Sequence, residues 1–357
     1  MKSNKKILII AGGTGGHIYP GIAIADYLKT KGWQITWLGT KNGMENKLIE
    51  SKPYQKAMID ITGVRGKNIL SWLKLPFMLL IALIQCAIAI KKEKPDVVIA
   101  MGGYVSFPGG LMGKLMGKPL IVHEQNFIPG LTNKLLAMIA THIYSAFPIK
   151  FMRHSEKIGN PVRDAIRKIK SPVQRFKSRK GPLRLLVVGG SLGAKFLNDI
   201  IPLSVQQINP KNRPMIIHQS GERHFQDLKW TYKKSGIKAN CMAYLDNIEK
   251  MYEWADLVIS RAGALTVSEF SVAGIPSILV PFPFAVDNHQ FYNAKYLSDK
   301  KAAQLIIQEE LTTELLSDLL KNMTRNQCLK MSKAALESKA IKPEEVIYQA
   351  CERLIKK

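Results

Sequence analysis

The stretch KILIIAGGTGG at residues 6–16 decides the fold of this 357-residue chain. Its first half is a continuous apolar run, which is typical of a strand buried on both faces of a parallel sheet. Its second half places glycines where the chain leaves the strand and begins a helix, so backbone N–H groups can approach an anion. RLLVVGGSLGA at 184–194 has the same form. We therefore predict two Rossmann-like domains that face each other over a cleft, with ligands at the carboxyl ends of the strands.

Short β-branched runs alternate with helix-length segments over most of the chain, which predicts an α/β fold with parallel sheets. A basic, proline-containing segment between about Lys150 and Pro182 interrupts this pattern, and we interpret it as a linker. The strands are expected at Lys6–Ala11, Gln34–Gly39, Val97–Met101, Leu120–His123, Leu185–Val188, Met215–His218, Asp256–Ser260 and Ser277–Val280.

The charge of the chain limits its possible partners. Its 52 Lys and Arg residues exceed its 27 Asp and Glu residues, so the formal net charge is +25. Basic proteins bind nucleic acid, anionic membranes or phosphorylated ligands. The lysines are spread along the chain, and no zinc-finger spacing or aromatic RNA-binding motif accompanies them. We therefore predict an anionic membrane surface or a phosphate ligand, and no nucleic acid.

The cysteines and the amino terminus indicate a cytoplasmic protein. Cys86, Cys241, Cys328 and Cys351 are scattered and form no CxxC pair, so neither a zinc site nor a disulfide framework is expected. The opening MKSNKK runs directly into ILIIA, which is too short for the apolar core of a secretory signal.

One long apolar segment, ILSWLKLPFMLLIALIQCAIAI at 69–90, bears on membrane binding. Lys74, Pro76 and Gln85 interrupt it, so its longest apolar run is well below the roughly 20 residues that a span requires. We interpret its second half as a helix packed on a sheet. Its first half mixes apolar side chains with Lys67 and Lys74, as in a patch that enters an anionic bilayer interface. The predicted membrane patch comprises Ile69, Leu70, Trp72, Leu73 and Phe77.

Three glycine clusters follow predicted strands: Gly12–Gly16, Met101–Ser106 and Gly189–Gly193. The first is not a dinucleotide fingerprint, because Ile18 stands where a further glycine is required and no acidic residue closes the second strand. The Gly-Lys-(Ser/Thr) P-loop is also missing from the sequence. Nicotinamide chemistry and nucleotide triphosphate hydrolysis are therefore not expected, and we predict another phosphate-rich ligand.

The segment Ser260–Glu269 should likewise leave a strand and open a helix. Its amides could neutralise a diphosphate, and the Thr266 hydroxyl could assist them. Glu269 falls within the first two turns, where a carboxylate could bind two ribose hydroxyls. A glutamate that only serves the helix dipole is the alternative.

A hydrolase is a competing hypothesis. Gly189–Gly193 fits the G-x-S-x-G nucleophile elbow around Ser191, and Asp287 and His289 follow in a suitable order for a triad. This reading leaves the first domain unexplained, and the chain shows no HGGG-type oxyanion loop. We therefore interpret Ser191 as a hydroxyl that binds phosphate.

Seven motifs together resemble the MurG family of N-acetylglucosaminyltransferases, which make the final membrane precursor of peptidoglycan. They are GGTGGHIYPGIAIA, MGGYVSFPGG, HEQNFIPGLTNK, GNPVR, GGSLGA, RAGALTVSE and DNHQFYNA, in matching order from the first strand to about residue 294. The resemblance implies a GT-B fold. It implies a membrane-facing acceptor domain at residues 1–162, a UDP-GlcNAc-binding domain at 163–341, and a C-terminal helix at 342–357 that packs back on the first domain.

The resemblance also implies roles for individual residues. Leu245 should hold the uracil through its backbone, Glu269 the ribose, and Gln290 the sugar hydroxyls. Ser191 and the amides at 264–266 should hold the phosphates. Residues from the first domain should reach across the cleft to donor and acceptor. The implied donor site comprises Thr14, Gly15, Gly16, Asn126, Arg163, Ser191, Leu245, Ala264, Leu265, Thr266, Val267, Ser268, Glu269 and Gln290.

The family inverts the anomeric centre, so the acceptor hydroxyl needs a base and the departing diphosphate needs stabilisation. His17 has a suitable intrinsic pKa, and Glu124, beside Asn126, is the rival base. The chain has no Asp-x-Asp motif of metal-dependent transferases. We therefore expect helix amides and Arg163 to stabilise UDP without a required cofactor, although a divalent cation could stimulate the enzyme through the acceptor pyrophosphate.

The implied reaction moves GlcNAc from UDP-GlcNAc to the 4-hydroxyl of undecaprenyl-pyrophosphoryl-MurNAc-pentapeptide (lipid I) and yields lipid II. The implied location is the cytoplasmic face of the inner membrane, as a peripheral protein near cell-wall synthesis and division proteins. A diacylglycerol glycosyltransferase or a UDP-GlcNAc epimerase of the same fold is the alternative. The first would lack the motif HEQN, and the second would need catalytic carboxylates and no lipid patch.

Overall fold

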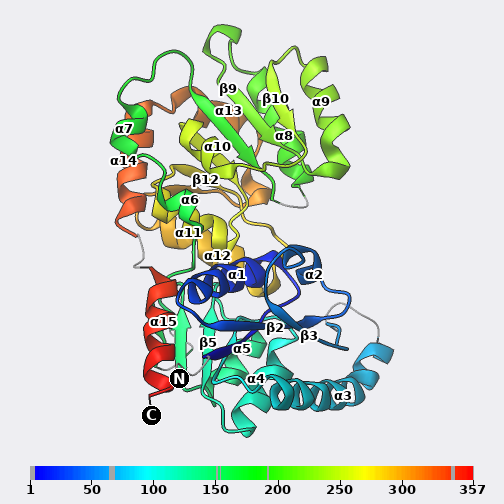
Figure 1. The fold of residues 1–357 in the computed structure, drawn as a ribbon. Helices are drawn as coiled ribbons and strands as arrows, with labels where there is room; N and C mark the ends of the chain where they lie inside the picture. The colour runs from blue at the N-terminus through cyan, green and yellow to red at the C-terminus, as the bar shows by residue number, and fades with distance from the viewer. Residues whose placement is uncertain are drawn as a thin grey trace. The chain divides into compact units, whose positions relative to one another are not determined.

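A computed structural model describes residues 5–63, 69–149, 152, 154–190, 193–338 and 342–356, with only the backbone described for 69–73. The chain divides into two compact units (Figure 1). Unit 1 comprises Met1–Pro161 with Ala340–Lys357, and unit 2 comprises Val162–Lys339. Each unit is built around one parallel sheet, which confirms the predicted α/β class.

The sheet of unit 1 has the strand order β3-β2-β1-β4-β5-β6-β7, and all its neighbouring strands are parallel. Its strands are β1 (Lys6–Ile10), β2 (Gln34–Thr40), β3 (Gln55–Ile59), β4 (Val97–Ala100), β5 (Leu120–Glu124), β6 (His142–Ser145) and β7 (Glu156–Lys157). Its helices are α1 (Gly15–Thr30), α2 (Glu45–Leu48), α3 (Ile69–Glu93), α4 (Ser106–Leu115), α5 (Leu131–Ala137) and α15 (Pro343–Leu354).

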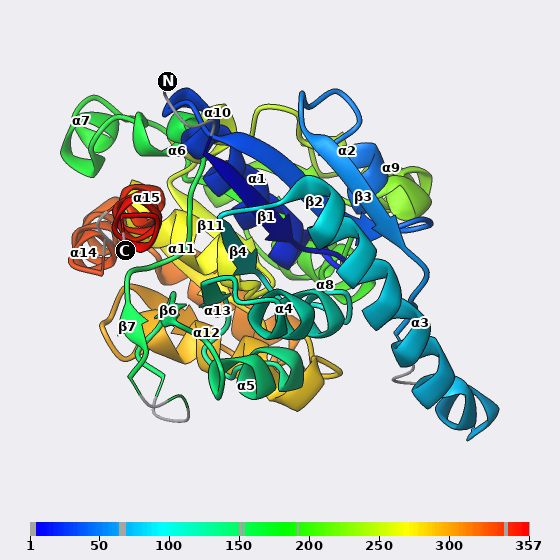
Figure 2. The same ribbon diagram turned by 60° about the horizontal axis from the view of Figure 1, so that its bottom comes forward.

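Helices cover both faces of this sheet, which explains the continuous apolar sequence of β1. Ile7 and Ile9 join a core shared with α1 and α15. Leu8 and Ile10 point to the opposite face and join a core shared with α3 and α5. Helix α15 packs against α1, and α3 lies along α4 (Figure 2). A strand with water on one face would instead alternate apolar and polar residues.

The sheet of unit 2 has the order β10-β9-β8-β11-β12-β13, again all parallel. Its strands are β8 (Arg184–Val188), β9 (Met215–Gln219), β10 (Ala239–Met242), β11 (Leu257–Ser260), β12 (Ser277–Leu279) and β13 (Ala303–Leu305). Its helices are α6 (Asp164–Arg167), α7 (Pro172–Phe176), α8 (Lys195–Gln206), α9 (Phe225–Lys234), α10 (Ile248–Trp254), α11 (Ala264–Ala273), α12 (His289–Ser298), α13 (Thr313–Asn322) and α14 (Arg325–Leu336). Short 3₁₀ helices lie at Pro210–Asn212, Glu222–His224, Val286–Asn288 and Gln308–Glu310.

Both sheets place the first strand of the unit beside its fourth, which is the Rossmann order. The direction of winding reverses at this point, so the loops after the two central strands diverge and leave room for a ligand. The glycine clusters at residues 12–16 and 101–106 follow β1 and β4, and those at 189–193 and 260–263 follow β8 and β11. The glycines therefore occur at the switch points of the two sheets.

The predicted linker contains the boundary between the two units, at Pro161 and Val162, but it is wrong where it includes two short helices. These are α6 and α7, which belong to unit 2. Ser171 and Gln174 form a capping box at the start of α7, with Pro172 in the first turn. Arg175 on α7 is only 5% exposed and donates to the carbonyl of Gly274. The basic composition of this segment concealed a packed element.

All eight predicted strands are present, each with one boundary shifted by one residue, but β3, β6, β7, β10 and β13 were missed. The missed strands lie at or near the edges of the sheets. Their exposed positions carry polar residues, so they lack the apolar runs that identified the central strands.

Helix α3 is not divided into a membrane patch in its first half and a core helix in its second half, as predicted. One stripe of its second half, Ala82, Cys86 and Ile90, is buried in the core of unit 1. The other side exposes large apolar side chains, and only 17% of the apolar 18-residue window within Lys74–Glu93 is buried. By length and composition alone this window could cross a membrane, with a mean hydropathy of 1.8. The second half of α3 is therefore both core helix and exposed apolar surface.

Candidate active site

The first glycine loop of unit 1 presents His17 at the end of β1. Thr14 is the N-cap residue of α1, and its carbonyl accepts from the amide of His17 at 3.0 Å. Gly102 and Gly103, in the loop after β4, have φ values of 107° and 80°. A Cβ atom on Gly102 would lie 2.8 Å from His17 Nδ1, and one on Gly103 would lie 2.3 Å from the carbonyl oxygen of Gly12. These glycines are therefore required to seat His17 and the first loop.

A chain of hydrogen bonds sets the tautomer of His17. His123 Nε2 lies 3.0 Å from the carbonyl of Gly159 and must donate to it, so His123 Nδ1 accepts from Gln125 Nε2 at 3.0 Å. This orients the Gln125 amide, whose Oε1 then accepts from His17 Nδ1 at 2.8 Å. Burial lowers the pKa of His123 to about 4, so its ring stays neutral at pH 7. The arrangement leaves Nε2 of neutral His17 with a lone pair that can accept a proton.

Glu124 anchors the loop that follows β5. It is 1% exposed, and its Oε1 accepts from the amide of Asn126 at 2.8 Å. Its Oε2 accepts from Asn133 Nδ2 at 2.8 Å and from the amide of Gly130 at 3.2 Å. Asn126 therefore lies beside Glu124, as the sequence predicts. These contacts favour a positioning role for Glu124 and leave His17 as the stronger candidate base.

The donor-site candidates of unit 2 gather at the start of α11. Gly263 is the N-cap residue, and the start of a helix is a suitable place for an anion because the positive end of the helix dipole lies there. Thr266 is half-buried in the first turn, and Ser268 Oγ donates to the carbonyl of Ala264 at 2.9 Å. Leu265 is half-buried, whereas Val267 is fully buried in the structure. Val267 therefore contributes through its backbone or through packing.

Glu269 lies in a buried electrostatic setting. Tyr252 OH donates to Glu269 Oε2 at 3.0 Å, and Arg163 Nη2 donates to Oε1 at 3.1 Å. The Glu269 side chain is 13% exposed, whereas the Arg163 side chain is 52% exposed. Burial raises the pKa of Glu269 above its usual value, while Arg163 and Tyr252 oppose this shift. A raised carboxyl pKa beside an exposed arginine is typical of a binding site.

Gln290 connects two loops of unit 2. Its Oε1 accepts from the amides of Ala262 at 3.2 Å and Phe282 at 3.0 Å, so its NH₂ group remains as the donor for a ligand. Asn293 Nδ2 donates to the carbonyl of Ala262 at 3.2 Å, so it also holds the loop that follows β11. Leu245, after β10, is 8% exposed.

Some predicted residues fall outside what the structure describes. Ser191 lies outside the described residues, and so do the side chains of Ile69, Leu70, Trp72 and Leu73. Phe77, the remaining residue of the membrane patch, is 73% exposed. Among the described residues, no group of three or more His, Cys, Asp or Glu side chains could hold a metal ion.

Gln125, His123 and Tyr252 were not among the residues predicted from the sequence. A usable signal was present for the first two, because alternate residues of an extended segment share one face. His123 and Gln125 therefore had to point the same way at the end of β5. No local pattern identifies Tyr252, whose contact with Glu269 joins two helices, α10 and α11.

Comparison with known proteins gives matches over both units. Residues 7–145 match the glycosyltransferase family 28 N-terminal domain, and residues 184–346 match the glycosyltransferase family 28 C-terminal domain. These matches, with the two separate sheets, contradict the hydrolase hypothesis.

Two full-length relatives carry the name "UDP-N-acetylglucosamine--N-acetylmuramyl-(pentapeptide) pyrophosphoryl-undecaprenol N-acetylglucosamine transferase". The relative from Nitrosospira multiformis is 48% identical over 351 residues, which is 98% of each chain. The relative from Dechloromonas aromatica is 44% identical and covers 99% of this chain and 100% of its own. A crystal structure of Acinetobacter baumannii MurG has a TM-score of 0.86 at 35% identity and covers 98% of this chain and 99% of its own.

Proposed function

The chain belongs to glycosyltransferase family 28, and we propose that it transfers N-acetylglucosamine from UDP-GlcNAc to N-acetylmuramyl-(pentapeptide) pyrophosphoryl-undecaprenol. The observation that carries this proposal is the 48% identity, over nearly the whole chain, to a relative named for that reaction. The product is lipid II, the disaccharide precursor of peptidoglycan.

The chemistry of the reaction assigns a task to each unit. The 4-hydroxyl of the muramyl sugar attacks the anomeric carbon of GlcNAc, the bond from that carbon to UDP breaks, and the configuration inverts. The hydroxyl proton passes to a base, and charge develops on the departing diphosphate. Backbone amides at the start of α11 are suited to stabilise this charge, because the positive end of the helix dipole lies there.

His17 is the base in this proposal. The hydrogen bond to Gln125 places the proton on Nδ1, so Nε2 can take the hydroxyl proton without a change of tautomer. Gln125 and His123 act as positioning residues through the chain that ends at the carbonyl of Gly159. Arg163, Glu269, Gln290 and the α11 amides are the proposed donor contacts.

Turnover of radiolabelled UDP-GlcNAc with a muramyl-pentapeptide pyrophosphoryl-lipid analogue tests the reaction directly. We expect a labelled disaccharide-lipid product, and its absence from folded protein that binds UDP would overturn the assignment. His17→Ala should lower kcat by about 10²–10⁴-fold at saturating donor. Near-normal kcat in this variant would remove His17 from the base role.

The variant Glu124→Gln provides the matched comparison for His17. It keeps a carbonyl oxygen for Asn126 but exchanges one acceptor for an amide group beside Asn133 and Gly130. We expect a lower melting temperature and a pH profile of kcat like that of the wild type. If the fall of kcat at low pH disappeared in Glu124→Gln and persisted in His17→Ala, the two residues would exchange roles.

We further propose that α3 attaches the enzyme to an anionic membrane surface from the cytoplasmic side. The exposed side of α3 carries large apolar side chains, and Lys74, Lys91 and Lys92 are exposed on the same helix. Apolar groups can enter the bilayer interface while lysines contact acidic headgroups. This surface extends the predicted patch toward the carboxyl end of the helix and comprises Phe77, Leu80, Ile81, Ile84 and Ile88.

A further inference from the structure

A basic surface pocket lies in unit 2, and none of its lining residues is one of the candidate donor contacts. Its cavity volume is about 420 Å³, and its charged lining comprises Lys170, Arg175, Arg179, Arg184, Lys250 and Glu253. Arg184 is the first residue of β8, and Asp256 directly precedes β11. The pocket is therefore at the amino ends of the central strands, whereas the candidate donor residues follow their carboxyl ends. The first and last residues of a strand of four or five residues are roughly 10–13 Å apart.

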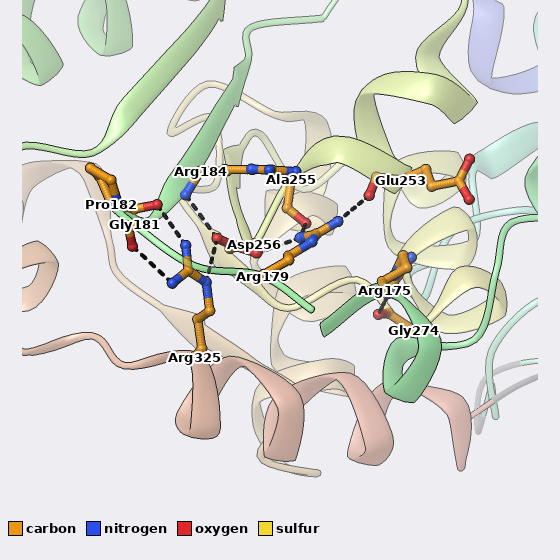
Figure 3. Close-up of polar contacts among 10 residues, drawn as sticks. All are labelled: Arg175, Arg179, Gly181, Pro182, Arg184, Glu253, Ala255, Asp256, Gly274 and Arg325. Atoms are coloured by element: carbon orange, nitrogen blue, oxygen red, sulfur yellow. Dashed lines mark hydrogen bonds and ion pairs between the residues drawn. The ribbon is translucent and has the colours of Figure 1, made fainter. Parts of the chain in front are cut away.

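One buried carboxylate serves two arginines, of which Arg179 lines this pocket (Figure 3). Asp256 is fully buried; its Oδ1 accepts from Arg179, and its Oδ2 accepts from Arg325 Nε at 3.0 Å. Arg179 also donates to the carbonyls of Glu253 and Ala255. Asp256 therefore neutralises only one of the two buried or half-buried cations.

Arg175 adds a third cation that has no carboxylate partner among the described residues. It is 5% exposed, and its Nη2 donates to the carbonyl of Gly274 at the end of α11 (Figure 3). Its Nε and Nη1 are buried, and neither has a hydrogen-bond partner in the described part of the chain. Burial, and secondarily the charge of Arg179, lowers the pKa of Arg175 to about 10, so the group remains charged at pH 7. A buried charge without a counter-ion is costly.

The exposed rim does not supply the missing negative charge. Glu253 is the one acid in the lining, and it already lies 3.7 Å from Lys170. Lys250 and Lys170 are both exposed. Together with Arg325 and Asp256, the lining holds six cations and two carboxylates.

We propose that this pocket is a second anion site, which binds a phosphate-bearing group at the amino ends of β8 and β11. A group with two or more negative charges fits the excess of positive charge, and arginine and lysine donors suit phosphate oxygens. Ser178 and Gln174 in the lining add uncharged donors. Trp254 adds an aromatic side chain to the lining. The group can belong to a free phosphorylated compound or to a phospholipid headgroup.

Titration calorimetry with inorganic pyrophosphate tests the site in the full-length protein. Saturating UDP is present throughout, so that the diphosphate position of the proposed donor site is occupied. We expect one binding event, which weakens as salt rises because the site is electrostatic. Lys250→Glu should weaken it by about tenfold or more, because it reverses a charge at the rim. Lys211→Glu, an equal change at an exposed lysine of unit 2 outside the lining, should leave it unchanged.

Arg175→Met tests the buried cation, and its melting temperature is recorded because the contact with Gly274 is lost. If Arg175→Met does not fold, Lys250→Glu alone tests the site. A second arm replaces pyrophosphate with vesicles that contain phosphatidylglycerol, compared with neutral vesicles. Binding that depends on Lys250 in this arm alone identifies a lipid headgroup as the source of the phosphate.

The proposal is overturned if neither probe binds with UDP present, or if both bind equally to the wild type and to Lys250→Glu. It does not depend on the transferase assignment. Arg163→Ala should weaken UDP binding while pyrophosphate binding at the pocket persists. The pyrophosphate titration therefore tests the pocket, and the UDP titration tests the donor site.

Discussion

Replacement of Glu269 by glutamine separates binding from stability in unit 2. The carboxylate is buried, with Tyr252 and Arg163 as its partners, and burial raises its pKa. A carboxyl whose pKa is raised on folding binds its proton more tightly in the folded state than in the unfolded chain. Stability from this group is therefore present at low pH and falls as pH rises from the ordinary pKa to the raised one.

The size of the stability change follows from the partners. Because burial raises its pKa, the carboxylate opposes folding when it is ionised, and Glu269→Gln removes that effect while Tyr252 can still donate to the amide oxygen. The lost ion pair contributes little, about 0–1 kcal/mol, because the Arg163 side chain is 52% exposed. We therefore expect the free energy of unfolding to be unchanged or higher by up to about 1 kcal/mol.

The affinity for UDP should change in the opposite direction. A hydrogen bond to a charged group contributes about 1.5–3 kcal/mol, so loss of the proposed ribose acceptor should raise Kd by about 10- to 150-fold. Calorimetry with UDP measures Kd, and urea unfolding measures stability. The control is Glu249→Gln, which removes another carboxylate whose charge acts on Arg163 and Glu269. It should change Kd by less than about threefold, since an indirect charge effect is small near the surface.

Two results would refute this reasoning. A Kd in Glu269→Gln within twofold of the wild type would show that the carboxylate does not contact the nucleotide. A loss of several kcal/mol of stability would show that Glu269 is a structural ion-pair partner. The combination of weaker binding and intact stability is specific to a ligand contact.

Three further predictions concern stability and membrane binding. Asp256→Asn should lower the free energy of unfolding by about 3–5 kcal/mol, because it leaves two arginines without their carboxylate, and a change below 1 kcal/mol in urea unfolding would contradict this. The pKa of His123 falls from 6.5 to about 4 on folding, so the unfolded chain binds more protons in this window and stability should fall by about 3 kcal/mol as pH falls through it. His123→Asn should remove that part of the pH dependence. If the stability of this variant changed with pH as that of the wild type does, the prediction would be contradicted. Phe77→Ser with Ile84→Ser should reduce co-sedimentation with anionic vesicles by about tenfold or more, whereas Trp230→Ser, a matched exposed residue of unit 2, should not.

Local patterns were sufficient for the backbone of the central strands and their loops. The apolar runs at β1 and β8 required sheets buried on both faces, and glycines after them required close approach of the backbone to another group. The glycine pattern alone did not show which group the backbone approaches. Gly102 and Gly103 have positive φ values and lie against His17 and the carbonyl of Gly12. Edge strands such as β3 and β7 lack these apolar runs, because their exposed positions can carry polar residues.

The sequence alone determined the two-domain α/β class, the switch-point loops and the candidates His17 and Glu269. Only the tertiary structure decided what those side chains contact. His17 meets Gln125 from 108 residues away, and Arg179 and Arg325 meet at Asp256. The physical reason is that backbone conformation follows from neighbours along the chain, whereas hydrogen bonds and burial follow from neighbours in space, which the order of strands in the sheet brings together.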